Sequence, residues 1–265
     1  LDVADELPDA FIEKIRAAVK RVSPEKFLLG EVWEDATTKY GFGHRRTYLL
    51  GKGLDSVMNY PFKNAVLDFV KGKPAQQAMN EILSICEHYP TPALNTALNF
   101  LSTHDTERAL TVIADEPANG RGREWQSSRN VSGEAYEEGM LRLRMAYAII
   151  YTLPGLPCLY YGDEIGMQGY RDPFNRGYYC WDSHEERLKP VLAQLAQLRH
   201  SCEAFRTGAL RVLRAEGGVL HYQRVGATET AEIIVNRSEH IIVEPLASGK
   251  HTEVNPMGFT IVVEE

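Results

Sequence analysis

The sequence predicts an α/β fold that is followed by a small antiparallel β domain. Through about residue 204, short apolar runs alternate with stretches in which apolar residues recur at helical spacing. Such alternation is typical of parallel strands that are joined by right-handed helical crossovers. From about residue 205 the pattern changes to short β-rich runs broken by Gly, Asn and Ser. We therefore predict an α/β domain over 1–204 and an all-β domain over 205–265.

The first elements follow from the spacing of apolar residues. In "DAFIEKIRAAVKRV", apolar residues recur every three or four positions, which predicts a helix over 9–22. "KFLLGEV" (26–32) is a short apolar run, as in a strand that is buried on both faces of a parallel sheet. "LDSVMNY" (54–60) repeats this pattern, and Pro61 opens a helix that extends to about residue 70.

The remaining elements continue the alternation. We predict helices over 73–88, 137–153 and 185–202, and strands in "ALNFLSTHD" (97–105) and "LPCLYYGDE" (156–164). The last part of the chain is expected to form antiparallel strands in "ALRVLRAEGGVLHYQRV", "TAEIIVNRS", "IIVEPL" and "GFTIVVEE".

The composition argues against several classes of partner. The chain has 29 basic and 36 acidic residues and a net charge of -7, and no basic run could follow a phosphate backbone, so we predict no nucleic-acid partner. No segment reaches the roughly 18 apolar residues of a membrane span, so no membrane partner is predicted. The four cysteines are scattered, which favours a reducing compartment, and we expect a cytoplasmic location.

Motifs for cofactors and metals are also missing from the sequence. It contains no zinc-ligand spacing, no G-x-S-x-G and no phosphate-binding glycine loop, so we predict no cofactor and no metal, although a structural calcium ion is not readable from a sequence. The opening "LDVADELPDAF" lacks Met and a signal peptide, and it reads as the end of a strand followed by the start of a helix. We expect further residues upstream in the natural protein.

Acidic residues stand where the predicted strands end. These residues are Asp2, Glu31, Asp105 and the pair Asp163 and Glu164. In α/β folds the carboxyl ends of parallel strands converge on the active site, so the side chains are expected to share one cleft. For any single one of them, a helix cap or a solvated loop residue is the alternative interpretation. The repetition favours a functional site.

Aromatic and basic residues accompany these carboxylates. Trp33 and Tyr60 lie near strand ends, where flat apolar faces suit stacking on sugar rings as well as ordinary packing. His104 precedes Asp105, and Arg108 follows one helical turn later. A salt bridge or a metal site is the competing interpretation of the His-Asp pair. Carboxylates beside aromatic residues favour glycoside chemistry, with His104, Trp33 and Arg108 as substrate-binding candidates.

Four segments, in this order, resemble the α-amylase family of glycoside hydrolases. "LDVADE" is similar to the family segment at the end of barrel strand four, "GEVW" to that of strand five, and "FLSTHDTER" to that of strand seven. "PGLPCLYYGDEIGMQG" and "DPFNRGYYCW" are similar to strand eight and its loop. The resemblance implies that Asp2 is the nucleophile, Glu31 the general acid/base, and Asp105 the carboxylate that supports the transition state beside His104.

The resemblance also implies a fold and an extent. It predicts the second half of a (β/α)8 barrel, from the end of strand four to helix eight, followed by a small antiparallel β-sandwich. The family's arginine before the nucleophile and its first strands would lie upstream, so we expect the chain alone to be inactive. Exposed strand edges can pair with the edge of another chain, so we expect that the protein can form a homo-oligomer through them.

The expected activity is retaining hydrolysis of α-glucosidic bonds in starch-like α-glucans, maltooligosaccharides or cyclodextrins. "DVADE" and "LDSVMNYPF" resemble the neopullulanase, cyclomaltodextrinase and maltogenic amylase branch, although Asp5 stands where Asn is usual and Glu34 where His is common. A glucanotransferase or isomerase of the same family is an alternative that the sequence separates poorly. A non-catalytic relative is a further alternative, which the joint presence of Asp2, Glu31 and Asp105 disfavours.

Overall fold

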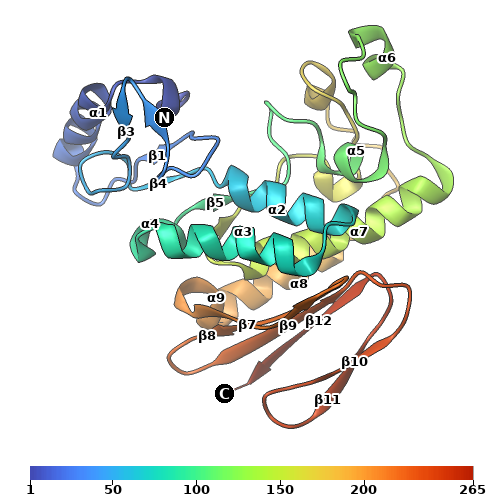
Figure 1. Cartoon of the computed structure of the whole chain (residues 1–265). Helices are drawn as coiled ribbons and strands as arrows, with labels where there is room; N and C mark the ends of the chain where they lie inside the picture. The colour runs from blue at the N-terminus through green and yellow to red at the C-terminus, as the bar shows by residue number, and fades with distance from the viewer. Residues whose placement is uncertain (265) are drawn as a thin grey trace.

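The computed structural model describes residues 1–264, and Figure 1 shows the order of their elements. The helices are α1 (Asp9–Val22), α2 (Tyr60–Lys71), α3 (Ala75–His88), α4 (Thr91–Asn95), α5 (Ala109–Ala114), α6 (Arg123–Ser127), α7 (Gly133–Thr152), α8 (Leu188–Ser201) and α9 (Ala204–Thr207). The strands are β1 (Leu29–Gly30), β2 (Tyr40–Gly41), β3 (His44–Arg45), β4 (Ser56–Val57), β5 (Leu98–Asn99), β6 (Leu156–Pro157), β7 (Ala209–Glu216), β8 (Val219–Val225), β9 (Thr230–Asn236), β10 (Ile242–Pro245), β11 (His251–Val254) and β12 (Gly258–Glu264). Short 3₁₀ helices are η1 (Ala4–Glu6), η2 (Asp163–Ile165) and η3 (Phe174–Arg176).

Parallel pairing links the strands of the first part into one series. β1 pairs with β4, a bridge between Met58 and Leu98 joins β4 to β5, and β5 pairs with β6. The main chain of Leu1 adds to the outer side of β1, because Leu1 N donates to Leu29 O and Glu31 N donates to Leu1 O. The strand ends that carry the predicted site residues therefore follow one another along a common edge.

The hydrogen-bonded strands are shorter than the apolar runs that predicted them. Each of these strands is two residues long, whereas the predicted strands had seven to nine. Just past the paired positions, main-chain bonds to the neighbouring strand continue, as from Asn59 N to Leu98 O, while polar side chains bond outside the ladder. The side chain of Asn59, for example, caps α2 by accepting from Phe62 N and donates to the side chain of Asn99. The chain thus passes from β4 into α2 with only Met58 and Asn59 between them.

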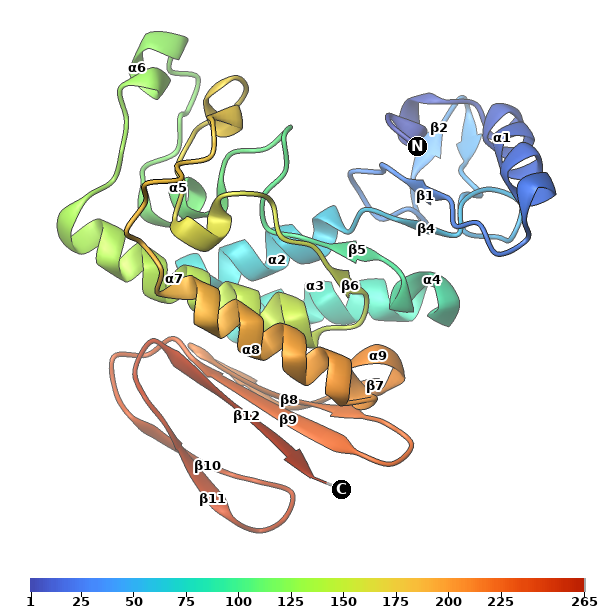
Figure 2. The same cartoon turned by 180° about the vertical axis from the view of Figure 1, so that it is seen from behind.

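The long helices pack against one another and supply most of the core. α2 packs against α3 and α7, and α7 packs against α5 and α8. The helices predicted over 9–22, 73–88, 137–153 and 185–202 are confirmed with shifts of at most four residues at their ends. Figure 2 shows α7 and α8 running side by side above the C-terminal sheet. Within residues 1–264, no helix combines the length and the apolar character that crossing a bilayer requires.

The C-terminal part is an antiparallel sheet that shares the core of the helices. Its strand order is β12-β9-β8-β7, and the hairpin β10-β11 covers the sheet through Ile234, Leu246 and Val254. On the other face, Tyr222 Oη lies 2.6 Å from Thr152 Oγ1 at the end of α7. Helical structure extends through α9, two residues past the predicted change at about residue 205, and β7 begins at Ala209, the first residue of the predicted β-rich run. The division into two domains stays a prediction.

Candidate active site

Glu31 stands where β1 leaves the core, and Gly30 makes this position accessible. A Cβ at Gly30 would lie 2.3 Å from Leu54 Cδ1 and 3.1 Å from the Ala4 Cβ, so only glycine allows these neighbours to approach. The side chain of Glu31 emerges immediately afterwards and is 8% exposed. The Gly-Glu sequence therefore places a nearly buried carboxylate at the carboxyl end of a parallel strand.

Both carboxylate oxygens of Glu31 accept hydrogen bonds. Val3 N donates to Oε2 at 2.9 Å, and the indole Nε1 of Trp33 donates to Oε1 at 3.1 Å, with the Tyr60 hydroxyl 3.5 Å from the same atom. Val3 adopts the left-handed conformation with φ 44° and ψ 40°, which is unfavourable for a β-branched residue by about 1–2 kcal/mol. The hydrogen bond to Glu31 accompanies this strained residue, which directly follows the predicted nucleophile.

Asp2 lies at the same edge as Glu31. The backbone of Leu1 bonds to β1 on both sides of Gly30, so Asp2 is the first residue beyond that pairing. The side chain of Asp2 is exposed, and its neighbour Val3 contacts the carboxylate of Glu31. The structure thus brings the backbone of the predicted nucleophile and the predicted acid/base together.

Asp105 follows β5 and is bonded to its predicted partner. His104 Nε2 lies 2.9 Å from Asp105 Oδ2, and Arg176 Nη2 lies 3.5 Å from Oδ1. The backbone N of Asp105 donates to Thr103 Oγ1 at 3.2 Å, which fixes the turn. The side chain of His104 is 56% exposed and that of Asp105 is 30% exposed, so both are open to a ligand.

The segment around η3 holds the Asp105 turn in place. Asn175, which is fully buried, donates through Nδ2 to the backbone O of His104 and Thr106, both at 2.7 Å. Arg176 Nε also donates to His104 O, at 3.0 Å. A loop more than 65 residues away in the sequence therefore sets the position of Asp105.

Arg108 is a positioning residue, which corrects the prediction that it binds substrate. Its side chain has no exposed surface, since Nε donates to Asn175 O and Nη1 bonds to Tyr161 O and to Asp163 Oδ1. The guanidinium lies over the rings of Tyr160 and Tyr161 at 4.6 and 4.7 Å. Asp163, one of the strand-end carboxylates, is buried in this contact. Neither side chain offers surface to a ligand.

A cleft of about 280 Å³ joins the aromatic residues to Asp105. Trp33 and Tyr60 stack with ring centroids 4.4 Å apart, and Trp33 remains 42% exposed. Burial raises the pKa of Tyr60 far above its ordinary value, and the charges of Glu31 and Asp105 raise it further. The cleft is lined by Trp33, Tyr60, Lys63, Asn64, Asp105, Thr106, Glu107, Val112 and Arg171.

Lys39 binds both acidic residues that depart from the resembled motifs. Its Nζ lies 3.1 Å from Asp5 Oδ2 and also contacts Glu34 Oε2. Burial lowers the pKa of Lys39, but the hydrogen bonds to Glu34 and Asp5 outweigh this effect and raise it above its ordinary value. Lys39 therefore offsets the added negative charge beside the Glu31 turn.

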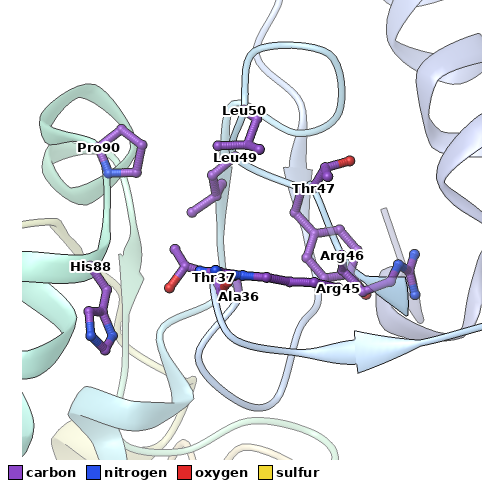
Figure 3. A pocket seen from close by; sticks show the side chains of 10 residues that line it. Ala36, Thr37, Arg45, Arg46, Thr47, Leu49, Leu50, His88 and Pro90 are labelled. Carbon is purple, nitrogen blue, oxygen red and sulfur yellow. Dashed lines mark hydrogen bonds between the residues drawn. The ribbon is translucent and has the colours of Figure 1, made fainter. Parts of the chain in front are cut away.

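A separate hollow lies away from these carboxylates. It has a volume of about 310 Å³, and Figure 3 shows it between the 36–50 segment and the end of α3. None of the predicted site residues lines it. Within residues 1–264, no group of three His, Cys, Asp or Glu side chains is arranged to hold a metal ion.

Sequence reasoning did not assign Lys63, Asn175 or Arg176 to the site. Asn175 and Arg176 lie in the quoted "DPFNRGYYCW" segment, so the resemblance marked their location but not their contacts. One local feature of the sequence could have pointed to Lys63. It lies three residues after Tyr60 in α2, on a helix face whose neighbours are buried.

Comparison with known proteins places this geometry in a family. Residues 6–207 match the model of "Alpha amylase, catalytic domain". A cyclomaltodextrinase of Geobacillus thermopakistaniensis is 32% identical over 252 residues, which cover 93% of this chain and 37% of that protein. Neopullulanase 2 of Thermoactinomyces vulgaris is 30% identical over 260 residues, which cover 94% of this chain and 39% of that protein. The chain thus spans about two-fifths of the length of these relatives.

Solved structures agree with this match. A cyclic alpha-maltosyl-(1→6)-maltose hydrolase from Arthrobacter globiformis superposes with a TM-score of 0.83 at 25% identity, covering 100% of this chain and 54% of that chain. The type III pullulan hydrolase from Thermococcus kodakarensis gives a TM-score of 0.81 at 27% identity, covering 100% and 44%. The chain belongs to the alpha-amylase catalytic domain family.

Proposed function

We propose that the protein carrying this chain is a retaining glycoside hydrolase that cleaves α-glucosidic bonds in α-glucans, maltooligosaccharides or cyclodextrins. The observation that carries the proposal is the placement of Glu31, a nearly buried carboxyl group at a strand end, beside the backbone of Asp2 and an aromatic cleft. The names of the cyclomaltodextrinase and neopullulanase relatives support this substrate class.

In the proposed reaction, Asp2 and Glu31 divide the work. Glu31 in its protonated form gives its proton to the glycosidic oxygen while the Asp2 carboxylate attacks the anomeric carbon, so that the C–O bond breaks and a glycosyl ester forms. Glu31 then removes a proton from water, which attacks the same carbon and releases Asp2. Asp105, held by His104 and Arg176, would bind sugar hydroxyls beside the reacting carbon.

We also propose that the series β1, β4, β5 and β6 is the second half of a (β/α)8 barrel. Its supports are the parallel pairing and the family match over 6–207. Among the described residues, β6 pairs with β5 only, and such an edge can pair with another chain. We therefore include in the proposal that another chain, such as a second copy of this one, pairs with this edge.

The test is a reducing-sugar assay of Glu31→Gln in the longest chain that carries this sequence, with maltoheptaose as substrate. We expect the activity to fall by about 100-fold to 10,000-fold, the range for a group that acts as general acid and base. Glu25→Gln is the matched control, because Glu25 is exposed and lies outside the cleft. Circular dichroism shows whether each variant folds.

The products distinguish hydrolysis from the transfer of glucan to a second sugar. Free reducing ends without longer oligosaccharides support the hydrolase, whereas oligosaccharides longer than the substrate indicate a glucanotransferase. Full activity of a folded Glu31→Gln protein would contradict the assignment of Glu31 and, with it, the proposed mechanism.

A further inference from the structure

Lys63 is a buried cation without a protein partner at the cleft. It lies in the first turn of α2, three residues after Tyr60, and its side chain is 8% exposed. Within residues 1–264, its ammonium makes no hydrogen bond or salt bridge, whereas Lys39 and Lys73 are each paired with carboxylates. Lys63 lines the same cleft as Trp33 and Asp105.

This arrangement is unfavourable for the chain by itself. Burial of an ammonium without hydrogen bonds is costly, so the charged form is destabilised. Burial lowers the pKa of Lys63 to about 8; the charges of Glu107 and Asp68 partly oppose this effect, and that of Arg171 adds to it. The charges of these two carboxylates therefore do not replace a hydrogen-bonding partner.

A polyol in the cleft would supply what Lys63 lacks. An ammonium has three N–H donors and no acceptor, and sugar hydroxyl and ring oxygens are acceptors. The stacked pair of Trp33 and Tyr60 forms an adjacent apolar wall, and Asp105 supplies acceptors for sugar hydroxyl protons. The cleft thus combines an aromatic surface, a donor and an acceptor within about 280 Å³.

We propose that Lys63 is a specificity-determining residue whose ammonium donates hydrogen bonds to the oxygens of an α-glucan lying in this cleft. This inference rests on the proposed function, because the proposed function supplies the class of ligand. It adds a residue outside the carboxylate set, on a helix that the active-site motifs do not include.

The proposal predicts proton uptake when the sugar binds. Ligand oxygens stabilise the charged form of Lys63, so binding raises its pKa, and affinity must fall as pH rises through about 8. The groups that face Lys63 are Asp68 on its own helix, Glu107, Asp105 and Arg171 on the neighbouring loops, and Tyr60. Carboxylates and guanidinium groups ordinarily titrate far from pH 8, and burial raises the pKa of Tyr60, so Lys63 is the group that responds.

The experiment is calorimetric titration of the longest chain that carries this sequence with maltotriose at pH 8, in two buffers of different ionisation enthalpy. The wild-type chain should take up about half a proton per ligand, because roughly half of Lys63 is neutral at that pH. Lys63→Met should take up none and bind about 10-fold more weakly or worse, the effect of losing a hydrogen bond from a charged donor. Lys71→Met, an exposed position on the same helix, should behave as the wild-type chain.

The outcomes separate the two proposals. If maltotriose binds to Lys63→Met with wild-type affinity and proton uptake, the assignment of Lys63 is wrong while the glucan-binding function stands. Wild-type binding without proton uptake also overturns the assignment, and this measurement does not depend on the variant folding. A wild-type chain that binds no maltotriose overturns the proposed ligand class and the role of Lys63 together.

Discussion

Arg108→Met should destabilise the chain more than most single substitutions do. Arg108 is fully buried, and its guanidinium bonds to Asp163 Oδ1 at 3.1 Å and to the backbone O of Asn175 at 3.0 Å. Asp163 is 1% exposed and would keep only uncharged partners, Tyr147 Oη at 2.7 Å and the Ser102 side chain, among the residues that the structure describes. Methionine fills much of the volume but leaves the carboxylate without its cation.

Removing one partner of a buried ion pair typically costs about 3–5 kcal/mol, and we expect a loss in this range. Because burial already raises the pKa of Asp163, loss of Arg108 should favour the neutral acid further. A folded-state pKa above the unfolded value makes the folded form bind the extra proton. The penalty of Arg108→Met should therefore be largest at pH 7 and shrink as pH falls toward 5.

Urea denaturation followed by circular dichroism measures this penalty at both pH values. The double variant Arg108→Met/Asp163→Asn removes the stranded charge and should recover a large part of the loss. A penalty below about 1 kcal/mol for Arg108→Met, small beside the usual cost of breaking a buried pair, would refute the reasoning. So would a double variant whose loss is the sum of the two single losses.

Two further predictions concern other charged groups. His221→Phe should cost about 1–3 kcal/mol in urea denaturation, because the almost fully buried carboxylate of Glu232 loses its imidazole partner at 2.9 Å, whereas Glu244 keeps its ion pair with Arg214; an unchanged midpoint would contradict this. Burial raises the pKa of Asp55, but the hydrogen bonds that it accepts, first of all from Lys20, outweigh burial and lower the pKa below its ordinary value. The contribution of Asp55 to stability is therefore lost as pH falls through this lowered pKa. The urea midpoint of the wild-type chain should fall as the pH is lowered from 6 to 3, and that of Asp55→Asn should fall by less.

The helices were predictable because their signals are local. The spacing of apolar residues fixed the positions of α1 and α7, and Pro61 correctly marked the start of α2, where it is the second residue. The strand β11 was missed, because its sequence "HTEV" lacks an apolar run and it pairs only with β10, in a two-stranded hairpin apart from the four-stranded sheet. The shortness of β1 and its parallel neighbours could not be predicted, because their apolar runs continue past the paired positions into the turns that carry the site residues.

The site was predictable where a residue's neighbours in sequence are also its neighbours in space. Glu31 and Trp33 are two residues apart and share a hydrogen bond, so the motif describes their contact. The environment of Arg108 depends on Asn175 and Tyr161, which are 67 and 53 residues away. The position of Arg108 one turn after the Asp105 motif therefore suggested a cleft residue, whereas the folding of the later loop buries it.

The two departures from the resembled motifs are compatible with a working carboxylate pair. Asp5 and Glu34 each add a negative charge beside the Glu31 turn, and Asp5 N donates to the backbone O of Glu31 at 3.3 Å. Lys39 contacts both carboxylates, so one ammonium serves two acidic residues that are 29 positions apart. The oxygens of Glu31 are instead engaged by Val3 and Trp33. The departures therefore change the rim of the site and its charge, and leave the immediate contacts of the acid/base candidate intact.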